Sequence, residues 1–225
     1  MAASLEAQTD EAAAGRVIRY VQGHKPGPGS LEVFSLSDYP APPAVKQRMA
    51  EGFRQRSAGP TLVAGDQVPD QRAILAGLGS EPATPGDAAH SVRSVSASPW
   101  SDLSRTVLMK GVLLSTRPAG VISARGSSGL SRTFQLEDGS LLEFSEDDYV
   151  AAGTRIRLVK EAFNTEVNGT PGVLSSARTE DGRGRSMLHW VTSTRSYRLV
   201  RVAQKGFEAS ESEALLINIA ERIPD

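Results

Sequence analysis

The stretch "SRTFQLEDGSLLEFS" constrains the fold of this chain more than any other. Two alternating runs flank an Asp-Gly pair, which is typical of a β-hairpin. A two-residue turn at Asp-Gly would pair Phe134 with a glutamate. A three-residue loop with Gly139 in the left-handed conformation pairs Phe134 with Leu142 instead. Because a slip of one residue turns a whole strand over, we expect the second register. It gathers four apolar side chains on one buried face: Phe134, Leu136, Leu142 and Phe144.

The composition of the chain changes near residue 103. Turn-forming stretches such as "GHKPGPGS" and "DYPAPP" dominate before this point, and alternating or β-branched runs dominate after it. We therefore expect a disordered leader over residues 1–14. A mixed, turn-rich region with one or two helices should follow over 15–103. An antiparallel, β-rich domain closed by a C-terminal helix should occupy 104–225.

The first half contains two strand candidates and two helix candidates. The strands are Gly15–Gly23 and the alternating run "SLEVFSL". A helix is predicted near residues 42–56, because two prolines suit its first turn and apolar side chains recur every four residues on one face. The stretch "DQRAILAGLG" predicts a short helix, and 80–101 a loop or linker. The apolar face of the longer helix holds Val45, Met49 and Phe53.

The second half is predicted to be mostly strands. Its first two, Thr106–Leu114 and Ala119–Ala124, would be joined by a turn at "STRP", and "ARGSSGLS" would form a flexible hairpin loop. Further strands follow the hairpin: "GTRIRLVK", Gly172–Arg178, Ser186–Val191 and Arg195–Ala203.

The chain should end in a helix. "SESE" matches a capping box, with Ser210 as the N-cap and Glu213 three residues later. Leu215 or Leu216, followed by Ile219 and Ile223, forms an apolar stripe. These elements predict an α+β fold with a mostly antiparallel sheet of seven or eight strands, the C-terminal helix and the helix near 42–56.

Composition excludes several classes of function. The 225-residue chain has no cysteine, which rules out disulfides, thiolate metal sites and a cysteine nucleophile. No apolar run approaches the roughly 18–20 residues of a membrane span. A formal net charge of −1 gives no reason to expect nucleic acid as a partner. The N-terminus lacks the basic and apolar regions of a signal peptide, which is compatible with a disordered leader of a cytoplasmic protein and equally with the mature form of an exported one.

The histidines and the glycine-rich stretches do not predict a catalytic or cofactor site. His24, His90 and His189 each lack a second ligand at the spacing of a metal site. His189 is expected to be a partly exposed strand residue, on the side opposite Trp190. Neither a nucleotide-binding glycine motif nor a G-x-S-x-G elbow is present. We therefore expect no metal, no cofactor and no recognisable catalytic residue.

Two kinds of charged segment are candidates for contact with a partner. "EFSEDD" is expected to form a solvated acidic turn, whose Glu146, Asp147 and Asp148 could contact a basic partner. Loops on a rigid sheet commonly carry recognition. The loops "RGSSG" and "TEDGRGR" therefore add three basic candidates: Arg125, Arg183 and Arg185.

One predicted strand also carries a basic face. Arg195 and Arg201 share that face with Tyr197 and Leu199. A single tyrosine is a thin platform for nucleic acid, and outward arginines commonly solvate a sheet or protect its edge. We interpret Trp190, Tyr197 and Leu199 as core residues that lie on two adjacent strands.

The stretch from Val167 to Ile223 reads "VNGTPGVLSSA", a turn, "MLHWVTSTRSYRLV" and finally "ASESEALLINIAERI". It resembles the C-terminal domain of bacterial envelope regulators of the anti-sigma type. Its ending is also similar to that of immunity proteins, which neutralise toxins delivered between bacteria. The resemblance implies a non-enzymatic protein of the bacterial envelope that works by binding another protein. It carries over no catalytic residue.

The leading hypothesis from sequence is therefore a non-catalytic bacterial protein that binds another protein, either to neutralise a toxin or to regulate an envelope process. A hydrolase is an alternative, and it requires one pocket that holds two or more of a set of four residues. A structural subunit that completes its sheet with a neighbour's strand is a further alternative. The four residues of the hydrolase hypothesis are Ser128, Glu143, Asp147 and His189.

Overall fold

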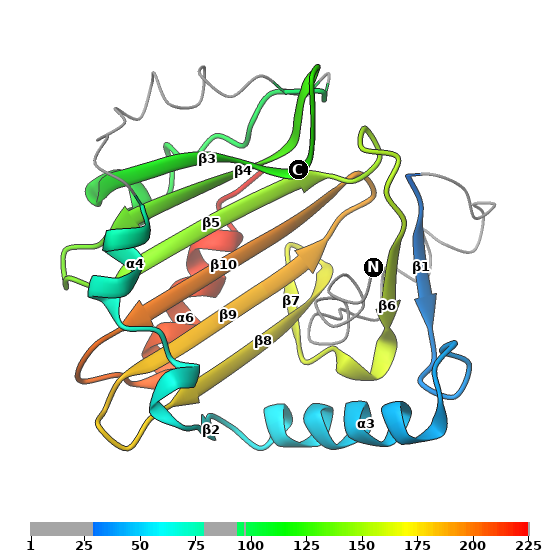
Figure 1. Ribbon diagram of the computed structural model, residues 1–225, viewed down its shortest axis with the longest axis horizontal. Helices are drawn as coiled ribbons and strands as arrows, with labels where there is room; N and C mark the ends of the chain where they lie inside the picture. Colours follow the sequence, from blue (N-terminus) through cyan, green and yellow to red (C-terminus); the bar gives the residue numbers. More distant parts are fainter. Residues whose placement is uncertain (1–28, 79–93, 97, 225) are drawn as a thin grey trace.

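The computed structural model describes residues 29–78, 94–96 and 98–224 (Figure 1). An eight-stranded, mostly antiparallel sheet forms its centre, with strand order β2-β8-β9-β10-β5-β4-β3 and with β7 beside β8. This arrangement confirms the predicted α+β class. The strands of the sheet are β2 (Thr61–Leu62), β3 (Val112–Ser123), β4 (Gly126–Gln135), β5 (Leu141–Asp148), β7 (Thr165–Val167), β8 (Thr170–Arg178), β9 (Gly184–Val191) and β10 (Arg195–Ala203).

The hairpin of β4 and β5 has the register predicted from its loop. Phe134 lies opposite Leu142, and the N–H of Leu136 donates a 2.9 Å hydrogen bond to the carbonyl of Ser140. Gly139 has φ +80°, the left-handed conformation that the three-residue loop requires. The four apolar side chains of this register are buried in one core cluster.

Helix α6 (Ala209–Ala220) packs against one face of the sheet, which is the far face in Figure 1. Leu216 and Ile219 lie in the core cluster with Leu188, Trp190 and Tyr197. The indole of Trp190 stacks on the ring of Tyr197 at 4.9 Å between centroids. The predicted apolar stripe and the predicted packing of adjacent strands are therefore confirmed.

The predicted capping box of α6 is wrong. The N-cap is Glu208, without a side-chain cap, and Ser210 lies inside the helix. Ser212 is fully buried. Glu213 accepts a 2.6 Å hydrogen bond from the hydroxyl of Ser176 on β8. A bond to the sheet has therefore replaced the local cap.

A smaller layer lies beside the opposite face, which we name the front face because it is turned to the viewer in Figure 1. Strands β1 (Leu31–Phe34) and β6 (Ile156–Val159) form a parallel pair. Helix α3 (Pro43–Ser57) buries Met49 and Phe53, as its periodicity predicts. Val173 of β8 belongs to the cluster under α3. A 3₁₀ turn, η3 (Lys160–Ala162), follows β6.

Helix α4 (Gln71–Gly77) crosses in front of the sheet, after a 3₁₀ turn, η1 (Gly65–Gln67). Asp70 caps it by accepting a bond from the backbone N–H of Arg72. The side-chain amide of Gln71 donates to the carbonyls of Gly139 and Val202, at 3.1 Å each. The short helix predicted from "DQRAILAGLG" is therefore confirmed, and side chains fasten it to the sheet.

The predicted strands before the hairpin need correction. Val107–Lys110 is a 3₁₀ helix, η2, and β3 then runs unbroken through the expected turn at "STRP". The expected loop "ARGSSGLS" lies mostly within β4. Pro118 fits inside β3 because this strand is at the edge of the sheet, where a missing N–H breaks no ladder bond.

Three sequence predictions fall outside the described residues: the leader 1–14, the strand Gly15–Gly23 and most of the linker 80–101. Within the described part of the chain, no helix is long and apolar enough to cross a membrane.

Candidate functional site

A row of polar side chains crosses the middle of the front face. His189 on β9 lies opposite Arg198 on β10, which lies opposite Ser145 on β5, and Ser145 lies opposite Ser131 on β4. Side chains directly opposite in neighbouring strands share one face of a sheet. These four residues therefore form the floor of a hollow of about 270 Å³ that they help to line.

The hollow brings together three of the four residues of the hydrolase hypothesis. Glu143, Asp147 and His189 all line it. The fourth, Ser128, donates its hydroxyl proton to Asp147 Oδ1 at 2.5 Å. His189 and the two acidic residues are two strands apart, or about 10 Å between backbones. Arg198 occupies the strand between them and pairs with Glu143 at 3.4 Å.

His189 is 5% exposed, so the expectation of a partly exposed histidine is wrong. Its strand face is the expected one, opposite to that of Trp190.

The surroundings of Asp147 raise the pKa of its carboxyl group. Burial raises its pKa, and the nearby charge of Asp148 raises it further. The hydrogen bond from Ser128 acts in the opposite direction, because it stabilises the ionised form. Asp147 therefore holds its proton to a higher pH than an ordinary aspartate does.

Asp147 and Ser128 also shape the end of the β3–β4 hairpin. Ser128 Oγ accepts a 2.8 Å hydrogen bond from the backbone N–H of Val121. The pairing of the strands shifts between Ala119 and Ile122, around Gly120 with φ +66°. A β-bulge increases local twist and bends a hairpin. The hairpin accordingly bends away from the sheet at its tip (Figure 1).

The tip of this hairpin, residues 121–125, exposes apolar side chains. Val121 is 48% exposed and Ile122 is 65% exposed. Arg125 is exposed in the turn between the two strands. We name these three residues the hairpin tip. Sequence reasoning identified Arg125 but missed the apolar pair, because "AGVIS" has the pattern of a buried strand. Pro118 and Gly120, just before the pair, were the available signal of an edge and a bulge.

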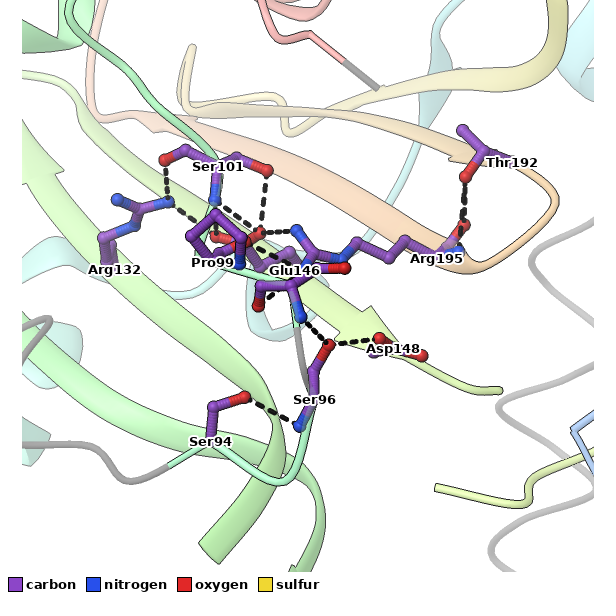
Figure 2. Close-up of polar contacts among 10 residues, drawn as sticks. Ser94, Ser96, Pro99, Ser101, Arg132, Glu146, Asp148, Thr192 and Arg195 are labelled. Atoms are coloured by element: carbon purple, nitrogen blue, oxygen red, sulfur yellow. Dashed lines mark hydrogen bonds and ion pairs between the residues drawn. The ribbon is translucent and has the colours of Figure 1, made fainter. Parts of the chain in front are cut away.

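Glu146 (Figure 2) is 1% exposed, and it lies opposite Tyr197 on the face of the sheet that α6 covers. Its carboxylate accepts hydrogen bonds from the backbone N–H of Ser101 at 2.9 Å and from the Ser101 hydroxyl at 2.7 Å. Arg132 pairs with it at 2.7 Å and Arg195 at 3.3 Å. Two cations and two neutral donors thus satisfy one buried carboxylate.

The same cluster fastens the segment before β3 to the sheet. Arg195 Nη2 donates to the carbonyls of Ser98 at 3.1 Å and Pro99 at 2.8 Å. Ser96 donates its hydroxyl proton to Asp148, whose other oxygen accepts from the backbone N–H of Ala151 at 2.8 Å. Figure 2 shows Ser101, Arg132 and Arg195 converging on Glu146, with Ser96 bonded to Asp148 beside them.

The expected solvated acidic turn is therefore wrong. "EFSEDD" is the last six of the eight residues of strand β5, where alternation sends Glu146 and Asp148 to the covered face and Glu143 and Asp147 to the front face. Glu146 and Asp148 are both buried, so neither lies on an exposed surface. Arg195, expected to point outward, is only 8% exposed because it pairs with Glu146.

The other predicted contact residues lie apart from one another. Arg183, in the loop before β9, pairs with Asp181 at 2.9 Å and donates to the carbonyl of Val68 at 3.0 Å. Arg185 is on β9 and lines a second hollow beneath α4. The structure thus places Arg125, Arg183 and Arg185 in three different surroundings.

Within the described residues, no group of three His, Asp or Glu side chains is placed to hold a metal ion. Comparison of the chain with protein-family models, curated proteins and solved structures finds no match. Function must therefore be argued from the residues themselves.

Proposed function

We propose that this protein is a non-catalytic binding protein that contacts another protein through the hairpin tip. The observation that carries the proposal is the pair of exposed β-branched side chains, Val121 and Ile122, at the end of a bent hairpin. Apolar side chains grouped on a surface mark interaction sites more often than scattered ones do. Arg125 beside them adds a residue type that is enriched in interface hot spots.

The hydrogen bonds below the tip support this role. Ser128 holds the N–H of Val121 and the carboxyl of Asp147 at the same time, so the bulge has a fixed shape. A surface held in its bound conformation loses less entropy on association than a flexible loop does. Asp147, one of the predicted partner-binding residues, acts here by positioning the tip.

The resemblance of residues 167–223 adds two specific roles to this proposal. One is neutralisation of a bacterial toxin, and the other is regulation in the bacterial envelope. Both would place the protein in the periplasm or at the envelope, and both require a protein partner.

The experiment is a pull-down from lysate with the full chain and with the double variant Val121→Asp/Ile122→Asp. We expect one stoichiometric partner that the double variant fails to retain. Met109→Asp/Leu75→Asp is the matched control, because it places the same two charges on exposed apolar residues elsewhere. A partner that both double variants retain equally would refute the role of the tip.

A hydrolase is the second candidate, since Glu143, Asp147 and His189 share one hollow. A raised aspartate pKa is common where a carboxyl acts as a general acid. A screen of ester, glycoside and phosphoester substrates would test it with the wild type and Asp147→Asn. Turnover that Asp147→Asn abolishes would support this candidate, and turnover unchanged in the variant would exclude Asp147 as its acid.

A subunit that extends its sheet has less support. The edge strand β3 contains Pro118 and two shifts of register, features that oppose pairing with a further strand. At the other edge, the short strands β2 and β7 already pair with β8.

A further inference from the structure

A hollow of about 300 Å³ lies between helix α4 and the front face of the sheet. Its roof is formed by Ile74 of α4 and by Pro69, which lies just before this helix. Its floor comes from β4, β5, β9 and β10, and it includes apolar side chains at Met187 and Val200. One part of this hollow is therefore lined by hydrocarbon on two sides.

The roof of the hollow is held in place at three points. Gln71 donates to the carbonyls of Gly139, in the β4–β5 loop, and of Val202 on β10, as described above. Arg183 Nη1 donates to the carbonyl of Val68, just before the helix. Arg117 Nη2 on β3 donates to the carbonyl of Gly77 at the end of the helix, at 2.5 Å. Because both ends of α4 are tied, the hollow is a preformed cavity under a fixed helix.

The charged side chains of the hollow favour an anion. Arg198 and Glu143 line it together and pair with each other at 3.4 Å. Arg185 is the remaining charged residue of its lining. Its backbone pairs within the sheet, but its guanidinium makes no hydrogen bond or ion pair with any residue that the structure describes. The charged side chains that line the hollow therefore carry one net positive charge, and this charge lies beside an apolar wall.

We infer that this hollow binds a small apolar molecule that carries one carboxylate, with the carboxylate on Arg185 and the hydrocarbon under Ile74. Arg185 can hold a carboxylate through two parallel N–H donors. A hollow of this size accommodates a ligand of about ten non-hydrogen atoms. Octanoate has that size and chemistry. This site is separate from the hairpin tip, so the inference does not depend on the proposed protein contact.

Titration of the full chain with sodium octanoate by calorimetry, with amide chemical shifts recorded in parallel, tests the inference. We expect one saturable site with a Kd of about 0.1–1 mM, typical of a ligand this small. The shift changes should centre on β9, β10 and α4. Octylammonium has the same chain and the opposite charge, so it should not bind there.

Two variants assign the site to its residues. Arg185→Gln should weaken octanoate binding about tenfold or more, because a charge-assisted bond is lost. Ile74→Asp should weaken it as well, because it places a negative charge under the roof. Arg125→Gln, which removes the same charge at the hairpin tip, should leave the affinity unchanged.

Thermal unfolding of each variant confirms that it is folded before its titration is interpreted. Three results would overturn the inference: no saturation up to about 10 mM octanoate, equal binding of octylammonium, or equal weakening by Arg185→Gln and Arg125→Gln.

Discussion

Ser128 donates its hydroxyl proton to Asp147 Oδ1 across 2.5 Å, from β4 to β5. This bond connects the polar floor of the front face to the bulge that bends the hairpin. The carboxyl group of Asp147 thus takes part both in the hairpin tip and in the hollow of the hydrolase candidate. The protonation of Asp147 and its contacts with neighbouring residues are therefore the first properties to test.

Asp147→Asn should raise the free energy of unfolding at neutral pH, by about 1 kcal/mol or less. Burial raises the pKa of Asp147 in the folded chain above the ordinary 3.8. The folded state therefore binds its proton more tightly than the unfolded state does, and wild-type stability falls as pH rises through this raised pKa. Urea unfolding between pH 3 and 7 should show the advantage of the variant growing with pH.

Asp138→Asn is the matched control for that pH dependence. Burial acts on Asp138 too, but hydrogen bonds from Ser140 and Arg201 hold its pKa below the ordinary value. The wild type gains stability from Asp138 as pH rises through this lowered pKa, so Asp138→Asn should become less stable relative to the wild type with rising pH, which is the opposite trend. Parallel curves for the two variants would show that Asp147 is not perturbed as we describe.

Glu146→Gln should destabilise the fold by about 3–5 kcal/mol, because it leaves two buried arginines without their shared charge. Glu143→Gln changes the same residue type on the same strand, but its pair with Arg198 is about two-fifths exposed on both sides. That change should cost less than about 1 kcal/mol. The midpoints of urea unfolding give both values, and similar costs for the two would contradict the buried cluster.

Gly120→Ala should disturb the bend of the hairpin. A Cβ at this position would lie 2.2 Å from Asp147 Oδ1 and 2.3 Å from Ser128 Oγ, on a backbone with φ +66°. Gly139→Ala has a similar φ of +80° and nothing within 4 Å of the added Cβ, so it isolates the backbone cost of about 1–2 kcal/mol.

We expect Gly120→Ala to cost about 1–3 kcal/mol more than Gly139→Ala, the usual range for a crowded site. Amide chemical shifts of Val121 and Ile122 should move with it. An equal cost for the two glycine variants, with those shifts unmoved, would mean that the bulge does not depend on this close approach.

Leu216→Ala should cost about 2–5 kcal/mol, because the side chain is fully buried between α6 and the sheet. Its neighbour Leu215 is only partly buried against the same core. Leu215→Ala should therefore cost clearly less, by thermal or urea unfolding. The reverse order would mean that α6 presents a different face to the sheet.

Local patterns in the sequence predicted most of the fold. The hairpin register followed from Gly139 and the alternation around it, and α3 followed from the spacing of Met49 and Phe53. In each case the residues that decide the structure lie within a few positions of one another. The strand of Arg195–Ala203 was predicted to the residue for the same reason.

The sequence could not predict the surroundings of Glu146. Its partners Ser101 and Arg195 are 45 and 49 residues away along the chain, so no local window contains the cluster. Four nearby acidic residues suggested solvation, and long-range pairing instead buried two of them. Pro118 led to the wrong prediction of a turn for a related reason. Only the order of the strands shows that β3 lies at the edge of the sheet.

The three arginines were predicted as contact residues from their loop motifs alone, and the sequence did not show which residues would surround them. Arg183 binds the carbonyl of Val68, 115 residues away, which makes it a support of the segment before α4. Arg125 stays on the surface, and Arg185 enters a hollow whose roof comes from the first half of the chain.

The order in which the chain is made sets a limit on how the cluster around Glu146 can form. The carbonyl of Pro99 accepts a hydrogen bond from Arg195, which lies 96 residues later in the chain. During synthesis, Glu146 and Arg132 are present well before β10, so the segment around Ser101 can meet only one of its two cations. Closing such a distant contact is slow compared with forming a hairpin. If β4 and β5 pair before β10 is made, Glu146 therefore has only one of its two arginine partners at that stage.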